Sequence, residues 1–189
     1  MGNGHIFLIG FMGAGKSSAA RAIRNKYGMD YIEMDQQIED EAGMSVSEIF
    51  KRIGEEEFRR METELIRSLA DKEFLVISCG GGVPVRKENV EEMRRQGTVV
   101  YLTASPETVF ERVRGRHHRP LLEGNMNVDY ISGLMDKRRE AYEAAADVRV
   151  STEGKTVREI ADEIMNLAGA VRERQESDEL EQERLYGLD

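Results

Sequence analysis

The sequence has little cysteine and no long hydrophobic run, and each shortage excludes a class of protein. Cys79 is the only cysteine, so no disulfide can form within the chain and a reducing cytoplasm is the expected location. The apolar stretch from His5 to Phe11 is too short to cross a membrane and has no basic flank. We therefore predict a soluble, cytoplasmic protein without a membrane partner.

The sequence is also poor in positive charge. The formal net charge is −9 and the isoelectric point is about 5.1. This balance argues against general nucleic-acid binding, which requires a basic surface to neutralise phosphates. A local cluster of arginines can still bind a small anion against the overall sign. The expected partners are therefore small molecules, and the chain is expected to be a monomer.

The apolar content is sufficient for one folded domain. Hydrophobic residues make up 40% of the 189 residues and charged residues 33%, which argues against wholesale disorder. We place a single domain at residues 1–170 and a charged tail at 171–189. The tail is interpreted as a solvated helix or a frayed terminus, with a partner-binding segment as the alternative.

Strands and helices are predicted to alternate along the domain. Short apolar runs, typical of buried parallel strands, are separated by stretches whose apolar residues have helical spacing. The predicted strands lie at 5–9, 29–34, 74–77, 98–102 and 148–150, and the predicted helices lie at 17–27, 45–54, 55–69, 90–95, 128–146 and 157–168, with a further helix starting at 106. This alternation implies an α/β fold with a parallel sheet between two layers of helices. A loop at about 113–127 is long enough to be a lid.

Residues 10–17, GFMGAGKS, match the P-loop pattern at every fixed position and lie between a predicted strand and a predicted helix. Glycines allow consecutive backbone N–H groups to turn inward, where they and the helix N-terminus can hold phosphates. Lys16 can reach the transferred phosphate, and Ser17 can offer its hydroxyl to Mg²⁺. The pattern predicts ATP as co-substrate and Mg²⁺ as cofactor, but it does not identify the acceptor. The nucleotide-binding residues predicted here are Gly13, Ala14, Gly15, Lys16, Ser17 and Ser18.

Four further segments and one arginine follow the P-loop in the order and spacing of the shikimate kinases. They are Glu33-Met34-Asp35, residues 58–62 (FRRME), Gly80-Gly81-Gly82, residues 119–122 (RPLL), and Arg138 followed by Tyr142. The sequence resembles this family from about residue 5 to residue 167, and the joint occurrence is far more specific than a P-loop alone. The resemblance implies a three-layer P-loop kinase with a five-stranded parallel sheet, a substrate-binding helical region at about 33–62 and a lid loop.

The resemblance also implies a role for each acceptor-side residue. Asp35 is expected to bind the ring hydroxyls of shikimate beside the one that attacks, while Arg59 and Arg138 hold its carboxylate. The glycines at 80–82 are expected to present backbone amides to the substrate. These roles suit the chemistry, because a guanidinium can form two parallel hydrogen bonds to a carboxylate. A carboxylate beside the attacking hydroxyl can orient it and accept its proton.

The nucleotide-side roles are carried over in the same way. Lys16, Asp35 and Arg119 are the expected catalytic residues, with Arg119 closing on the phosphates from the lid. Arg112 looks like the residue that stacks on adenine, and Lys155 lies in the loop that covers adenine in the family.

The resemblance implies ATP-dependent phosphorylation of the 3-hydroxyl of shikimate, a step towards chorismate and the aromatic amino acids. The alternatives are another small-molecule P-loop kinase, such as a gluconate kinase, and a regulator that binds nucleotide without turnover. One residue departs from the family pattern, since Glu33 stands where the family has aspartate. We predict that Glu33 and Ser17 support Mg²⁺, Glu33 through water.

Overall fold

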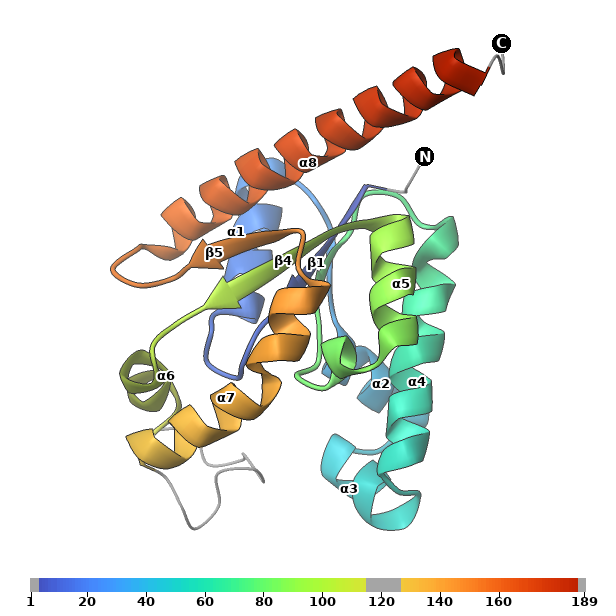
Figure 1. Cartoon of the computed structure of the whole chain (residues 1–189). Coiled ribbons are helices and arrows are strands. Elements are labelled where there is room, and N and C mark those ends of the chain that lie inside the picture. The colour runs from blue at the N-terminus through green and yellow to red at the C-terminus, as the bar shows by residue number, and fades with distance from the viewer. Residues whose placement is uncertain (1–3, 115–126, 187–189) are drawn as a thin grey trace.

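The computed structural model describes residues 4–114 and 127–186, with side chains to Asp178 and that of Leu180, and its centre is a five-stranded parallel sheet (Figure 1). The strands are β1 (His5–Ile9), β2 (Tyr31–Glu33), β3 (Val76–Ser78), β4 (Gly97–Thr103) and β5 (Val148–Ser151). Their order in the sheet is β2-β3-β1-β4-β5, and every neighbouring pair is parallel. On central strand β1, Leu8 is in register with Ser78 on one side and Val100 on the other. The predicted α/β class and the predicted sheet are confirmed.

Helices cover both faces of this sheet. They are α1 (Lys16–Tyr27), α2 (Met34–Ala42), α3 (Val46–Arg52), α4 (Glu55–Ser68), α5 (Lys87–Gln96), α6 (Pro106–Val113), α7 (Val128–Ala145) and α8 (Val157–Tyr186), with short 3-10 helices η1 (Leu69–Asp71) and η2 (Val83–Val85). Ile6 and Leu8 of β1 pack with α1 and α8, whereas Phe7 and Ile9 pack with α2 to α7 on the opposite face. The side-chain alternation of a strand thus supplies both cores.

Local signals in the sequence set several helix ends. Gly28 ends α1 in the left-handed conformation, at φ 75°, which a glycine adopts without steric cost. Ser45 and Glu48 form a capping box at the start of α3. Ser105 caps α6, with Pro106 in the first helical position.

The structure corrects three of the sequence predictions. The third strand begins at Val76, because Phe74 has φ 47° and is half exposed. Helix α2 was not predicted, since its nine residues carry only two buried apolar side chains, Met34 and Ile38. The last helix does not end at residue 168 but continues to Tyr186, so the predicted tail is helical from residue 171 to residue 186.

Two further observations bear on the predictions. Within residues 4–114 and 127–186, no helix has both the length and the apolar character needed to cross a membrane. Most of the predicted lid, including its arginine at position 119, lies outside the described residues.

Candidate active site

The P-loop connects the end of β1 to the start of α1. Gly10, Gly13 and Gly15 have φ values of 146°, 77° and 102°, which favour glycine. A Cβ at Gly10 would lie 2.5 Å from the backbone oxygen of Leu102, so this position has no room for a side chain. The Nζ of Lys16 donates to the backbone oxygen of Gly10 at 2.7 Å. The lysine therefore folds back over its own loop, where phosphates are held in proteins of this pattern.

The carboxyl ends of three parallel strands bring Ser17, Glu33 and Ser78 together. Ser17 follows the P-loop of β1, Glu33 ends β2 and Ser78 ends β3. The Ser17 hydroxyl donates to Glu33 Oε2 at 2.9 Å and lies 3.5 Å from the Ser78 hydroxyl. Glu33 Oε1 is buried and accepts no hydrogen bond from any described residue. Glu33 thus contacts the residue that follows the P-loop lysine through Oε2, while its Oε1 has no partner among the described residues.

Two carboxyl groups meet over Gly80, directly after β3. A Cβ at Gly80 would lie 2.9 Å from Asp35 Oδ1 and 2.6 Å from Glu62 Oε1. Asp35 lies in the first turn of α2 and is exposed, whereas Glu62 on α4 is fully buried. The glycine is required because both carboxyl groups approach its backbone. Asp35 is thus exposed at the carboxyl edge of the sheet, on the side of the P-loop.

Arg59 lies beside the carboxyl group of Glu62 and is contacted by residues of α4 and by Gly82. Its Nη1 donates to Glu62 Oε2 at 2.8 Å, and its Nη2 donates to Glu55 Oε1 at 3.0 Å. Its guanidinium also lies over the ring of Phe58, 5.4 Å from the centroid. A Cβ at Gly82 would lie 2.2 Å from Arg59 Nη1, so the guanidinium rests directly on this glycine. The side chain is 18% exposed, and these contacts fix its orientation.

Arg138 approaches the same glycine run from α7. Its Nη1 donates to the backbone oxygen of Gly81 at 3.3 Å, and a Cβ on that glycine would lie 3.0 Å from the same atom. The buried Tyr142, one helical turn further on, donates its hydroxyl to the Gly81 oxygen at 2.7 Å. Arg59 and Arg138 thus contact neighbouring glycines, from helices on different sides of the site.

Burial changes the protonation of Glu62. Desolvation raises the pKa of this carboxyl to about 7, with the nearby charge of Asp35 adding to the effect and the hydrogen bond from Arg59 opposing it. Near neutral pH, Glu62 is therefore divided between a charged form that pairs with Arg59 and a neutral form.

We expect the contribution of Glu62 to the free energy of unfolding to fall as the pH rises. A carboxyl whose pKa is higher in the folded protein than in the unfolded chain stabilises at low pH and loses that contribution as the pH rises through the folded pKa. From pH 5 to pH 7.5, the free energy of unfolding of the wild type should fall relative to that of Glu62→Gln by up to about 3 kcal/mol. Urea unfolding across this range, with Glu64→Gln on the exposed side of the same helix as control, measures the difference. Parallel pH profiles for wild type and Glu62→Gln would contradict the assignment.

The two residues predicted to contact adenine lie on α6 and in the loop after β5. Arg112 on α6 donates to the backbone oxygen of Gly13 at 3.1 Å and to the hydroxyl of the buried Thr152 at 3.0 Å. Lys155 follows β5 and pairs with Glu163 of α8 at 2.5 Å. Arg112 is therefore hydrogen bonded to the P-loop. Lys155 lies three residues after Thr152, which also accepts a hydrogen bond from Arg112.

Sequence patterns alone did not identify three contributors to this site. Ser78 and Thr152 lie at strand ends and have no motif of their own, so only the register of the sheet brings them to the P-loop. Glu62 lies three residues after Arg59, a spacing that lets the two side chains meet on one helix face, but spacing alone does not predict its burial.

The sheet order, the P-loop after the central strand and the cluster of acceptor-side charges define a P-loop kinase of a small molecule. A family model described as shikimate kinase matches residues 12–168. The chain belongs to the shikimate kinase family.

Individual relatives agree with this assignment. The shikimate kinase of Persephonella marina is 42% identical over 161 residues, which cover 85% of this chain and 96% of the relative. The solved structure of a shikimate kinase from Acinetobacter baumannii in complex with shikimate superposes with a TM-score of 0.80 at 30% identity, covering 87% of this chain and 92% of that one. A gluconokinase from Sinorhizobium meliloti has a TM-score of 0.56 at 21% identity, covering 91% of this chain and 97% of that one, which shows a shared fold alone.

Proposed function

We propose that this protein transfers the γ-phosphate of ATP to the 3-hydroxyl of shikimate, giving shikimate 3-phosphate and ADP. The observation that supports this most strongly is the placement of Arg59 and Arg138 against Gly82 and Gly81, beside Asp35. Two guanidiniums offer a carboxylate clamp, and Asp35 offers an acceptor for a hydroxyl proton.

The proposed reaction requires three actions from the chain. Arg59 and Arg138 fix the ring by its carboxylate, so that the reacting hydroxyl lies near Asp35. The hydroxyl oxygen forms a bond to the γ-phosphorus, its proton passes to Asp35, and the bond to the leaving ADP oxygen breaks. Lys16 stabilises the negative charge of the phosphates during transfer. Arg119, outside the described residues, remains the proposed arginine of the lid.

The residues near Ser17 fit Mg²⁺. The described part of the chain contains no group of three or more His, Cys, Asp or Glu side chains that could hold a metal alone. Mg²⁺ commonly uses one or two protein oxygens together with nucleotide phosphates and water. Ser17 Oγ would hold the ion directly and Glu33, whose Oε1 accepts no hydrogen bond from any described residue, would hold it through water; the ion would offset the charge of the phosphates.

Glu33→Asp should have a mild effect, seen mainly in the Mg²⁺ dependence of the rate. A water-mediated contact tolerates a change of one methylene, although the shorter side chain should lengthen the 2.9 Å contact with Ser17. We expect the Mg²⁺ concentration at half-maximal rate to rise a few-fold, with kcat at saturating Mg²⁺ within about threefold of wild type. A Mg²⁺ titration at saturating ATP and shikimate measures both. A large loss of kcat that Mg²⁺ does not restore would place Glu33 in the phosphoryl-transfer step itself.

The choice of acceptor can be tested on the carboxylate clamp. Arg138→Lys keeps the charge but removes the planar fork, so KM for shikimate should rise roughly 30-fold, corresponding to about 2 kcal/mol. The matched control is Arg139→Lys, because this neighbouring side chain is 59% exposed and pairs with Asp136. Both variants and the wild type should be assayed for ADP release with shikimate, quinate and gluconate.

The expected pattern is a preference for shikimate in the wild type, a raised KM in Arg138→Lys and no change in Arg139→Lys. A wild type that prefers gluconate, or an unchanged KM in both Arg138→Lys and Arg138→Ala, would refute the proposed acceptor or its clamp.

We further propose that the enzyme acts as a cytoplasmic monomer. This is consistent with its free, buried cysteine and with its net charge of −9, which favours solubility.

A further inference from the structure

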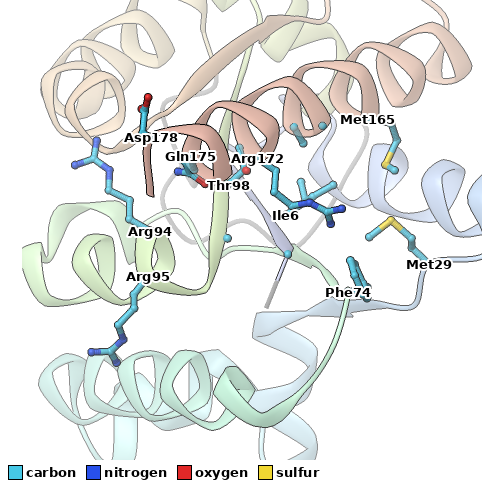
Figure 2. Close-up of a pocket in the computed structure, with 14 residues that line it drawn as sticks. Ile6, Met29, Phe74, Arg94, Arg95, Thr98, Met165, Arg172, Gln175 and Asp178 are labelled. Carbon is cyan, nitrogen blue, oxygen red and sulfur yellow. The ribbon is translucent and has the colours of Figure 1, made fainter. Parts of the chain in front are cut away.

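A second cavity lies at the opposite end of the sheet from the P-loop. It has a volume of about 740 Å³ and is bounded by the starts of β1 and β4, by α5 and by the middle of α8 (Figure 2). The P-loop follows the other end of β1, so the length of the sheet separates this cavity from the candidate active site. Its volume is within the range of small-molecule sites, which is about 300–1,000 Å³.

One end of the cavity is apolar and contains a strained aromatic residue. Figure 2 shows Phe74 near Met29, Met165 and Ile6, at the end of the cavity next to the start of β1. Phe74 has φ 47°, a conformation that is rare for a bulky residue, and half of its surface is exposed. Strained backbone of this kind is concentrated at ligand sites. Methionine sulfur and a phenyl face are both favourable contacts for an aromatic ring.

Arg172 brings a positive charge to this apolar end. Its guanidinium lies over the ring of Phe74, 5.6 Å from the centroid. It donates no hydrogen bond to any described side chain or backbone oxygen, and its ion pair with Glu176 is made by Nε at 3.4 Å. A guanidinium that stacks on a ring keeps its in-plane N–H groups available for a carboxylate. The cavity therefore combines an aromatic face with an available anion-binding group.

The other charges around the cavity are largely paired. Arg94 pairs with Asp147 at 3.6 Å and donates to the backbone oxygen of Ala144, and Arg95 pairs with Glu92. The acidic residue in the lining is Asp178. Arg172 is therefore the lining arginine whose Nη groups are available to an anion.

We propose that this cavity binds a small aromatic carboxylate, with the ring between Phe74 and the two methionines and the carboxylate on Arg172. The site is separate from the shikimate and nucleotide sites, and none of its residues takes part in the proposed reaction. Arg172 belongs to the part of α8 beyond residue 168, where the match to the family model ends. The proposal therefore concerns a second ligand of this chain rather than the acceptor of phosphate.

Calorimetric titration of the full chain with 3-phenylpropanoate, in the presence of ADP and with and without saturating shikimate, tests the proposal. We expect one bound acid per chain in both conditions, and at least tenfold weaker binding of the neutral 3-phenylpropanamide. Arg172→Gln should weaken binding of the acid at least tenfold. The matched control is Arg174→Gln, because Arg174 donates within its own helix to Ala170 and does not line the cavity.

Several results would overturn the proposal. One is the absence of binding to the wild type, and another is equal binding by Arg172→Gln. Displacement of the acid by shikimate would place it on the carboxylate clamp of the active site, and equal binding of the amide would remove the role of Arg172. Sedimentation that shows a dimer dissociated by Arg172→Gln would make the cavity an interface between copies of this chain.

Discussion

Lys16→Ala should lower kcat for phosphoryl transfer by at least about 100-fold, because it removes a positive charge from the place where charge develops on the transferred group. The Nζ of Lys16 now donates to the backbone oxygens of Gly10 and Phe11, at 2.7 and 3.2 Å. These contacts hold the ammonium over the phosphate-binding loop. Steady-state ADP release with ATP and shikimate measures the loss.

The variant must be shown to be folded, since Lys16 also contacts its own loop. Circular dichroism and the urea midpoint should remain close to those of the wild type. Lys87→Ala is a suitable control, because that side chain is 91% exposed on α5 and pairs with Glu91 one turn away. A folded Lys16→Ala protein with the turnover of the wild type would remove the P-loop from the mechanism.

Asp35→Asn should lower kcat by roughly 100- to 10,000-fold, the range expected when a general base is lost. The amide keeps the size of the side chain and can still hydrogen bond to a ring hydroxyl, so KM for shikimate should change much less than kcat. Asp35 is exposed in the first turn of α2, so the substitution should leave the fold intact. Rates at saturating shikimate, with separate fits of kcat and KM, distinguish chemistry from binding.

Asp40→Asn is the matched control for this substitution. Asp40 lies on the same helix, is exposed, and accepts a hydrogen bond from Gln36 at 2.9 Å. A loss confined to KM in Asp35→Asn, with kcat unchanged, would show that Asp35 binds the ring without taking its proton.

The sequence was sufficient to predict the sheet and the nucleotide loop. Continuous apolar runs such as residues 5–9 are typical of buried parallel strands, and the P-loop glycines require backbone conformations that few other residues adopt. The helix starts predicted at 45 and 106 lie at Ser45 and Ser105, whose side chains accept hydrogen bonds from backbone N–H groups three residues on.

Features that depend on tertiary packing were harder to predict. Helix α2 has a mostly polar sequence, and it is held by the burial of Met34 and Ile38 rather than by a visible periodic pattern. Phenylalanine is common in strands, but Phe74 lies before the start of β3. Its ring lies under the guanidinium of Arg172, almost 100 residues further along the chain. The burial that raises the pKa of Glu62 likewise depends on how α4 packs against the strands.

The identity of the phosphorylated product tests the proposed function most directly. The purified protein should be incubated with ATP, Mg²⁺ and shikimate, and the product examined by ³¹P and ¹H NMR. The account predicts one new phosphomonoester on the 3-hydroxyl, formed with one ADP per shikimate and formed at least about 100-fold more slowly by Lys16→Ala. Phosphate on another hydroxyl, or ADP formed without any shikimate phosphate, would contradict it.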